Sequence, residues 1–195
     1  MKRLHPTIRA AARGELPEWT VAGPARRAHM LRVSELMKSW ASELGFSRTK
    51  RARWAAAGLL HDALRDEAPR RLRSKLPKRL RDLPDAVVHG PAASERLRRE
   101  GVEDEALLLA VAFHSLGHPG MGRMGRAICC ADFLEPGRTS ARAYRDGLLE
   151  RMPNELDDVL FEIFSGRLDG VRKRGGKMTR WTRDFWKEIK GRASG

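Results

Sequence analysis

The chain has 195 residues, and apolar side chains make up 41% of them, which supports a folded core and excludes a disordered protein. Charged residues reach 33% and the formal net charge is +14, which favours polyanionic partners such as nucleic acid or phosphorylated small molecules. The longest apolar runs, "AAAGLL" and "LLLAVAF", are too short to cross a bilayer, so no membrane association is expected. The start of the chain lacks the apolar segment of a secretory signal, and Cys129 and Cys130 are neighbours that rarely bridge each other. We therefore expect a cytoplasmic protein.

The apolar spacing predicts an all-α protein, beginning with two long helices. The first covers residues 26–44, where His29 lies on the same stripe as the apolar residues that follow at helical spacing. The second covers residues 49–63 and ends with His61 on its apolar face. Gly58 in this second helix predicts a close approach to a neighbouring helix.

The segment 66–88 is rich in arginine and proline, and we expect it to be irregular apart from one short helix. The next helix is bounded by Pro91 in its first turn and by Gly101 at its end. This boundary places His89 just before the helix.

Two further helices carry polar residues on their apolar faces. Residues 103–116 form a helix with His114 on the inward face, and residues 122–134 form a helix with Asp132 one turn after an apolar position. His118 forms an i, i+4 pair with His114, but the glycine and proline around it are expected to end the helix first. We therefore do not expect His118 to be a metal ligand, and we expect both cysteines to be buried thiols.

The tail has a different composition. An acidic amphipathic helix is followed by a basic linker at residues 171–177 and by an aromatic, basic helix at residues 178–190. One interpretation is that this last helix docks on the core through its apolar face, and this is the interpretation we favour. The alternative is that it binds RNA together with the basic loop 70–81, by phosphate contacts and base stacking.

Six polar residues fall on inward faces, each from a different helix or helix start except for one adjacent pair. A charged aspartate is rarely buried unless it is paired or holds a metal. Four imidazoles and two carboxylates are a plausible ligand set for one or two borderline divalent metals, inside a helical bundle rather than in a zinc finger. The set is His29, His61, Asp62, His89, His114 and Asp132.

Each of these residues also has a structural interpretation. A single histidine on an apolar face is usually a hydrogen-bonded core residue, Asp62 could cap a helix, and Asp132 could pair with Arg126 or Arg138. The joint pattern favours a metal site, because all six groups would otherwise need separate partners. Asp62 could bridge two ions about 3.5–4 Å apart, which can hold a hydroxide and clamp a phosphate.

The spacing H…HD…H…H…D resembles that of the HD superfamily of metal-dependent phosphohydrolases. The phrases "RRAHMLRV", "AAAGLLHDALRD", "HGPAAS", "AVAFHSLGHPGM" and "ADFLEPGR" resemble those of its YqeK-type symmetrical bis(5'-nucleosyl)-tetraphosphatases, in the same order. The resemblance covers roughly residues 24–145. It implies an HD-domain helical bundle that hydrolyses diadenosine tetraphosphate to two ADP through a metal-bridged hydroxide.

The resemblance also implies roles for residues. One metal ion would be held by His29, His61, Asp62 and Asp132, and the other by His89 and His114, with Asp62 bridging and taking part in catalysis. The ions would be two irons, with manganese or zinc as alternatives. Arg65, where the family commonly has lysine, would stabilise phosphoryl charge as a second catalytic residue. Arg138, Ser115 and Gly117 would join Arg65 in binding the substrate.

These interpretations divide the chain into an N-terminal segment (1–23), an HD domain (24–150) and a basic helical C-terminal extension (151–195). The arginine-rich segment and the tail depart from the family pattern, which leaves the nucleotide open. The expected partner is a dinucleoside polyphosphate. The alternatives are another nucleotide, such as a guanosine alarmone, or a basic module that binds RNA.

Overall fold

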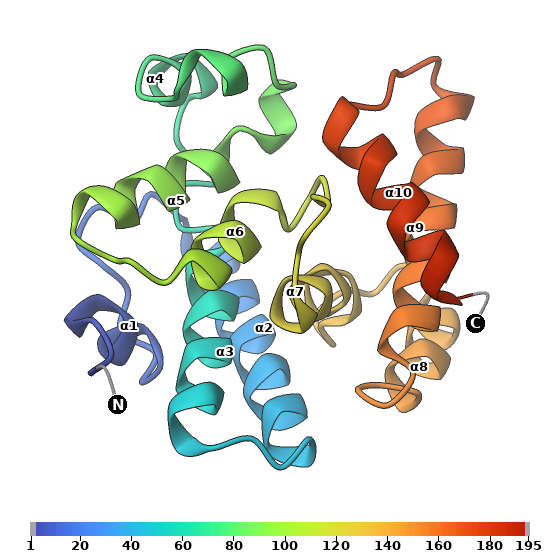
Figure 1. Ribbon diagram of the computed structural model, residues 1–195, viewed down its shortest axis with the longest axis horizontal. Helices are drawn as coiled ribbons and strands as arrows, with labels where there is room; N and C mark the ends of the chain where they lie inside the picture. Colours follow the sequence, from blue (N-terminus) through green and yellow to red (C-terminus); the bar gives the residue numbers. More distant parts are fainter. Residues whose placement is uncertain (1–2, 194–195) are drawn as a thin grey trace.

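The computed structural model describes residues 3–193, and these residues form helices and loops without a strand (Figure 1). This confirms the predicted all-α class. The helices, in chain order, are α1 (Pro6–Ala11), α2 (Pro24–Glu43), α3 (Arg48–Leu60), α4 (Pro69–Arg73), η1 (Lys78–Leu80), η2 (Asp85–Val87), α5 (His89–Arg99), α6 (Glu105–Phe113), α7 (Arg123–Leu134), α8 (Arg142–Glu150), α9 (Leu156–Lys173) and α10 (Arg180–Ala193).

The helices α2 and α3 form an antiparallel pair that packs closely. A Cβ atom at Gly58 would lie 2.8 Å from the Cα atom of Ser34, so a larger residue at Gly58 would push the helices apart. The Ser34 hydroxyl also donates a hydrogen bond to the Ala55 carbonyl oxygen, at 2.8 Å. The predicted close approach at Gly58 is therefore confirmed.

The core lies between this pair and α5, α6 and α7. The predicted apolar stripes are buried, including Val33 and Met37 of α2, Val111 of α6 and Ile128 of α7, each with no exposed side-chain surface. Burial of a large aliphatic side chain stabilises the fold by about 1.5–3 kcal/mol. The core thus holds these five helices against one another.

The segment 66–88 is more ordered than predicted. It contains α4, η1 and η2, and its leucines at positions 72, 76, 80 and 83 are buried against α5 and its neighbours. His89 is the first residue of α5 rather than the residue before it. The prediction took Pro91 as the start of the helix, but helical geometry begins two residues earlier.

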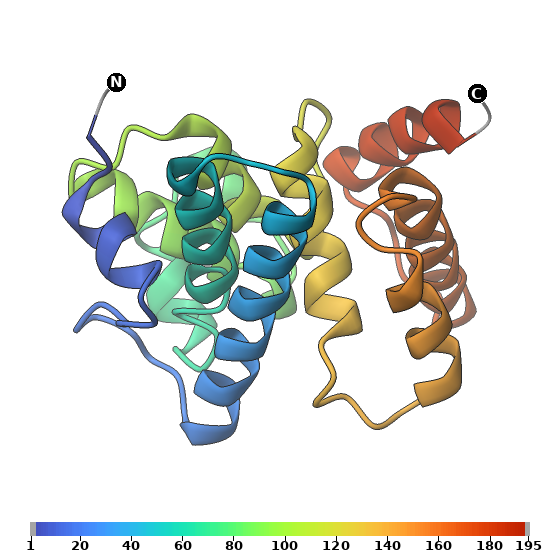
Figure 2. The same cartoon turned by 90° about the horizontal axis from the view of Figure 1, so that it is seen from below.

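The C-terminal helices α8, α9 and α10 gather on one side of α7, and the α2–α3 pair lies on the other side (Figures 1 and 2). Phe185 and Ile189 of α10 are fully buried in the common core. The last helix therefore docks on the core, as the favoured interpretation predicted. The predicted linker 171–177 begins later than expected, because α9 continues through Lys173 and residues 174–179 connect it to α10.

Residues 1–2 of the predicted N-terminal segment and residues 194–195 of the predicted extension lie outside the described residues. Across residues 3–193, every helix is too short or too polar to cross a membrane.

Candidate metal centre

The fold brings all six predicted ligand residues to one place in the core. They come from the second turn of α2, the residues directly after α3 and α6, the first residue of α5 and the last turn of α7. Five of the six are buried and the sixth, Asp132, is half-buried; the set is His29, His61, Asp62, His89, His114 and Asp132.

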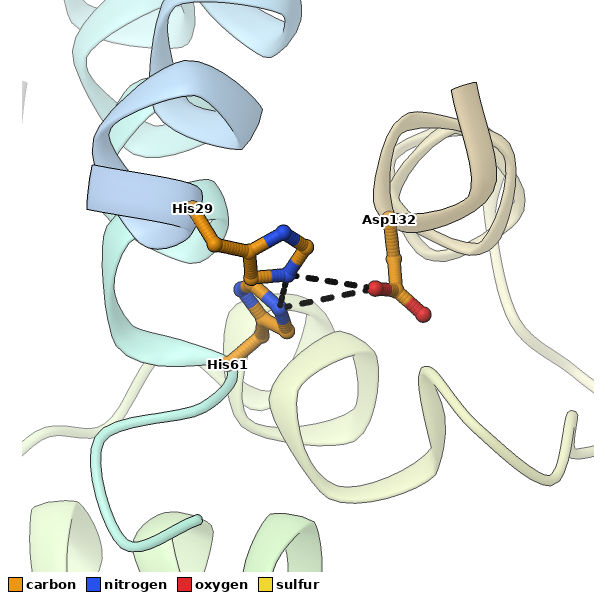
Figure 3. Close-up of side chains that lie close together, drawn as sticks. All are labelled: His29, His61 and Asp132. Carbon is orange, nitrogen blue, oxygen red and sulfur yellow. Dashed lines mark hydrogen bonds and ion pairs between the residues drawn. The ribbon is translucent and has the colours of Figure 1, made fainter. Parts of the chain in front are cut away.

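The first cluster joins α2, the end of α3 and α7. The Nε2 atoms of His29 and His61 lie 3.3 Å apart. The Oδ1 atom of Asp132 lies 3.3 Å from His29 Nε2 and 4.0 Å from His61 Nε2. Figure 3 shows the three side chains pointing toward one another, so a single cation could contact all three.

The second cluster is built around the other side of Asp62. Its Oδ1 atom lies 3.0 Å from His89 Nε2 and 3.5 Å from His114 Nε2, and these two imidazole nitrogens lie 3.2 Å apart. Its Oδ2 atom lies 3.5 Å from His61 Nε2 and 3.7 Å from His29 Nε2. One oxygen of Asp62 therefore faces each histidine pair, which is the placement a bridging carboxylate needs.

Backbone carbonyls orient two of the imidazoles. His61 Nδ1 lies 2.7 Å from the Gly58 carbonyl oxygen, and His114 Nδ1 lies 2.9 Å from the Val111 carbonyl oxygen. An Nδ1–H that donates to a carbonyl leaves the Nε2 lone pair free to bind a metal. In both cases the Nε2 atom is the one that faces the other ligands, so the donor set fits a transition metal.

Glu135 is a site residue that the sequence analysis missed. Its side chain is 2% exposed, and its Oε1 atom lies 3.2 Å from His29 Nδ1. It forms an ion pair with Arg32 and accepts a hydrogen bond from the Gly137 backbone N–H at 2.8 Å. Burial alone would raise the pKa of Glu135, but the hydrogen bonds from Arg32 and His29 lower it to about 2. Glu135 thus orients the His29 imidazole, as backbone carbonyls orient those of His61 and His114.

At Asp62, Asp132 and His61 the electrostatics favour the forms that bind cations. At His114, burial alone would lower the pKa, but the hydrogen bond with Asp62 and the charge of that carboxylate raise it. Burial lowers the pKa of His61 to about 4, so this imidazole is neutral at pH 7. Burial alone would raise the pKa of Asp62, but the imidazoles of His61, His114 and His89 hold it well below its usual value. The pKa of Asp132 is lowered in the same way, chiefly by the hydrogen bond with His29. Ionised carboxylates and neutral imidazoles are the forms that bind metals.

Two arginines border the centre at an opening to solvent. Arg26 lies 2.7 Å from Asp62 Oδ2, and Arg138 lies 2.7 Å from Asp132 Oδ1. Both line a cavity of about 370 Å³ together with His29 and Glu135. The predicted alternative of an Asp132–Arg138 pair is therefore present alongside the contact with His29, whereas Arg126 pairs with Asp157 instead.

The other predicted site residues lie around this centre. Arg65 is half-buried, and its positive charge adds to the effect of burial in lowering the pKa of His89. Ser115 is half-buried directly after His114. Gly117 has a φ of +71°, and a Cβ atom there would lie 2.0 Å from the ring of Phe185, so this glycine makes room for α10.

Three residues that were not expected to be ligands lie outside the two ligand clusters. His118 hydrogen-bonds to the Pro119 carbonyl oxygen through Nδ1, and its ring packs on Phe113 at 4.5 Å. Cys129 and Cys130 are fully buried, and burial raises the pKa of the Cys129 thiol to about 12. Both cysteines are therefore buried neutral thiols, as predicted.

The model of the HD domain family matches residues 26–162, which include all six clustered residues and most of the bundle. The chain belongs to the HD domain family.

Among curated proteins, the chain is similar to symmetrical bis(5'-nucleosyl)-tetraphosphatases. The Staphylococcus aureus protein of this name is 29% identical over 167 residues, which cover 78% of this chain and 81% of that protein. The Bacillus subtilis protein is 39% identical over 67 residues, and the Halalkalibacterium halodurans protein is 40% identical over 55 residues. These two matches cover 34% and 28% of this chain, and 36% and 29% of the respective relatives.

A solved structure from Clostridium acetobutylicum, described as a "predicted HD superfamily hydrolase involved in NAD metabolism", has the same fold. Its TM-score is 0.74 at 24% sequence identity, and the alignment covers 87% of this chain and 91% of that chain. The fold of this protein is therefore that of an HD-domain bundle.

Proposed function

We propose that this protein is a cytoplasmic, metal-dependent phosphohydrolase that splits diadenosine tetraphosphate symmetrically into two ADP. The observation that carries the proposal is the position of Asp62, whose two oxygens each face a separate pair of imidazoles. The name shared by the three curated relatives supports the choice of substrate.

In the proposed centre, His29, His61 and Asp132 would hold one ion and His89 and His114 the other, with Asp62 available to both. Iron is the first expectation, because imidazole and carboxylate donors suit iron, with manganese and zinc as alternatives. Two such ions would supply a hydroxide nucleophile at neutral pH and neutralise charge on a phosphate. Asp62 is therefore the residue on which both the metal content and the activity depend.

The surrounding arginines would bind and orient the tetraphosphate. Guanidinium groups form charge-assisted hydrogen bonds with phosphate oxygens, often in pairs. Arg138 lines the cavity beside His29, Arg26 lines it from the first turn of α2, and Arg65 lies one turn beyond Asp62. Ser115 and Gly117, in the loop that follows His114, would shape the wall against a nucleoside. Arg65 and Arg138 would stabilise charge on the phosphate chain during cleavage.

The products of hydrolysis test this proposal. Diadenosine tetraphosphate is incubated with the metal-loaded protein, and the nucleotides are separated by chromatography. We expect ADP as the sole product, formed at two molecules per substrate. The Asp62→Asn variant should be inactive, and Asp158→Asn, at an exposed position of α9, should act like the wild type.

AMP plus ATP as products would contradict symmetrical cleavage. The same assay is repeated with a guanosine alarmone as the substrate. Hydrolysis of the alarmone without hydrolysis of diadenosine tetraphosphate would contradict the proposed substrate and leave the phosphohydrolase class intact.

A further inference from the structure

A second concave surface lies at the opposite end of the α2–α3 pair from the metal centre. The centre uses the beginning of α2 and the end of α3, whereas this groove takes residues 35–42 of α2 and residues 48–55 of α3, with α1 as its third wall. At a rise of 1.5 Å per residue, Lys38 is about 14 Å further along α2 than His29. The groove is therefore a separate site.

Small side chains keep this groove open. Ala12 directly follows α1, α2 contributes Ser39, and α3 contributes Ala52 and Ala55 at positions that share a helix face. Side chains of this size cannot fill the space between three helices. The volume of the groove is about 880 Å³, which is within the range of small-molecule sites.

The rim of the groove is strongly basic. Five basic side chains line it against one carboxylate, Glu35, among the described residues; the basic residues are Arg9, Arg13, Lys38, Arg48 and Arg51. Lys38 lies 3.7 Å from Glu35, and Arg13 pairs with Glu15. Within residues 3–193, the guanidinium groups of Arg9 and Arg48 have no carboxylate partner. The groove thus has an excess of positive charge that the described protein does not neutralise.

We propose that this groove binds the phosphate chain of a nucleotide ligand, either a nucleoside polyphosphate or a single-stranded nucleic acid. Both carry consecutive phosphates, which arginine forks bind in pairs. The hydroxyls of Ser42 and Thr49 offer further donors, whereas that of Ser39 already donates to Glu43. The alanine floor offers apolar contact to a sugar or base. A concave surface with cations on three helices fits a chain of phosphates better than a flat lipid surface.

A binding experiment tests this proposal. The probe is a fluorescein-labelled oligouridylate of ten residues, measured by fluorescence anisotropy with the full chain, with ATP and inorganic tripolyphosphate as competitors. The test variant is Arg9→Ala with Arg48→Ala. The matched control is Arg183→Ala with Lys187→Ala, which removes two exposed cations from α10. Melting temperature and tetraphosphate hydrolysis should stay the same in both variants, because these residues lie outside the metal centre.

We expect the groove variant to bind the probe at least tenfold more weakly, with the control within threefold of the wild type. Loss of two phosphate contacts should also reduce the slope of log Kd against log salt by about 1.4 for a single strand. If tripolyphosphate binds as tightly as the oligouridylate, the ligand is a free polyphosphate. If the oligouridylate binds more tightly than tripolyphosphate, the ligand is a nucleic acid. Either result supports the proposal.

Equal weakening in the groove variant and the control would overturn the proposal, because binding would then follow net charge alone. Hydrogen exchange gives a second measurement that does not depend on any variant. Tripolyphosphate added to the wild type should slow exchange in residues 9–13 and 48–52, and protection confined to other segments would also overturn the proposal. Because these experiments measure binding, a failure of the groove proposal can be distinguished from a failure of the proposed hydrolysis.

Discussion

At the scale of single residues, Glu135 connects the protein surface to His29, a proposed metal ligand. It contacts His29 Nδ1 and is itself held by Arg32 and the Gly137 backbone. We expect Glu135→Ala to weaken metal binding by about 10–100-fold, because an imidazole without its outer partner is poorly oriented. Glu135→Gln keeps one acceptor oxygen and should lose less.

A metal titration against a competing chelator checks this prediction, with the exposed Glu155→Ala as the control. If Glu135→Ala bound metal as tightly as the wild type, Glu135 would be a purely structural partner of Arg32.

Arg65 is the second residue whose role can be measured. It lies in the turn after Asp62, and its backbone N–H donates to the Asp62 carbonyl oxygen at 2.9 Å. We expect Arg65→Ala to lower kcat by on the order of a hundredfold, as for the loss of one donor to developing charge. Steady-state kinetics on diadenosine tetraphosphate would show this, and Arg70→Ala, at an exposed position of α4, serves as the control. A rate equal to that of the control would remove Arg65 from the site.

The sequence identified the residues that cluster in the core better than the partners that surround them. His61 and His114 stand on apolar helix faces, where an imidazole is conspicuous, and the adjacent aspartate marks the centre. Arg26 could not be distinguished in this way, because it is one of 39 lysines and arginines in the chain. The signal for Glu135 is its spacing of three residues from Asp132, but it lies just past the end of α7 in a non-helical conformation. The periodicity of apolar residues therefore does not single it out.

At the scale of elements, the last helix contributes to the stability of the whole fold. The fully buried ring of Phe185 lies against Gly117, in the loop that follows His114. We expect Phe185→Ala to lower the free energy of unfolding by about 3–5 kcal/mol, because it removes a buried aromatic ring and leaves a cavity. Urea unfolding measures this change.

The control is Lys187→Ala on the same helix, which is exposed and should change stability by less than about 0.5 kcal/mol. Equal stability of the two variants would mean that α10 is only loosely docked.

Element boundaries followed the apolar pattern where it is long and regular. The bounds of α2 and α7 agree with the prediction to within two residues at each end. The short helices α1 and α8 were not predicted, because six and nine residues carry too little periodicity to distinguish them from loops. The basic stretch 171–177 indicated a linker, but α9 continues into it as far as Lys173. The helix ends just before Gly175, whose φ of +67° is the left-handed conformation that glycine adopts readily at helix ends.

At the scale of the whole molecule, the arginines that carry the positive charge lie in two kinds of environment. Some arginines are bound to carboxylates of the metal centre, and others line the groove between α1, α2 and α3. A net charge of +14 would attract any polyanion at low salt. The cavity beside the metal centre and the groove each concentrate part of this charge. The first is proposed for hydrolysis and the second for binding.

The metal content of the purified protein tests the central claim most directly, which is that Asp62 bridges two histidine pairs around bound ions. Elemental analysis should find roughly one to two transition-metal ions per chain in the wild type. The Asp62→Asn variant should lose most of this metal and melt at a lower temperature, because a bound ion stabilises the folded state. Asp158→Asn, which makes the same chemical change at an exposed position, should retain the full amount. Full metal content in Asp62→Asn would contradict the account.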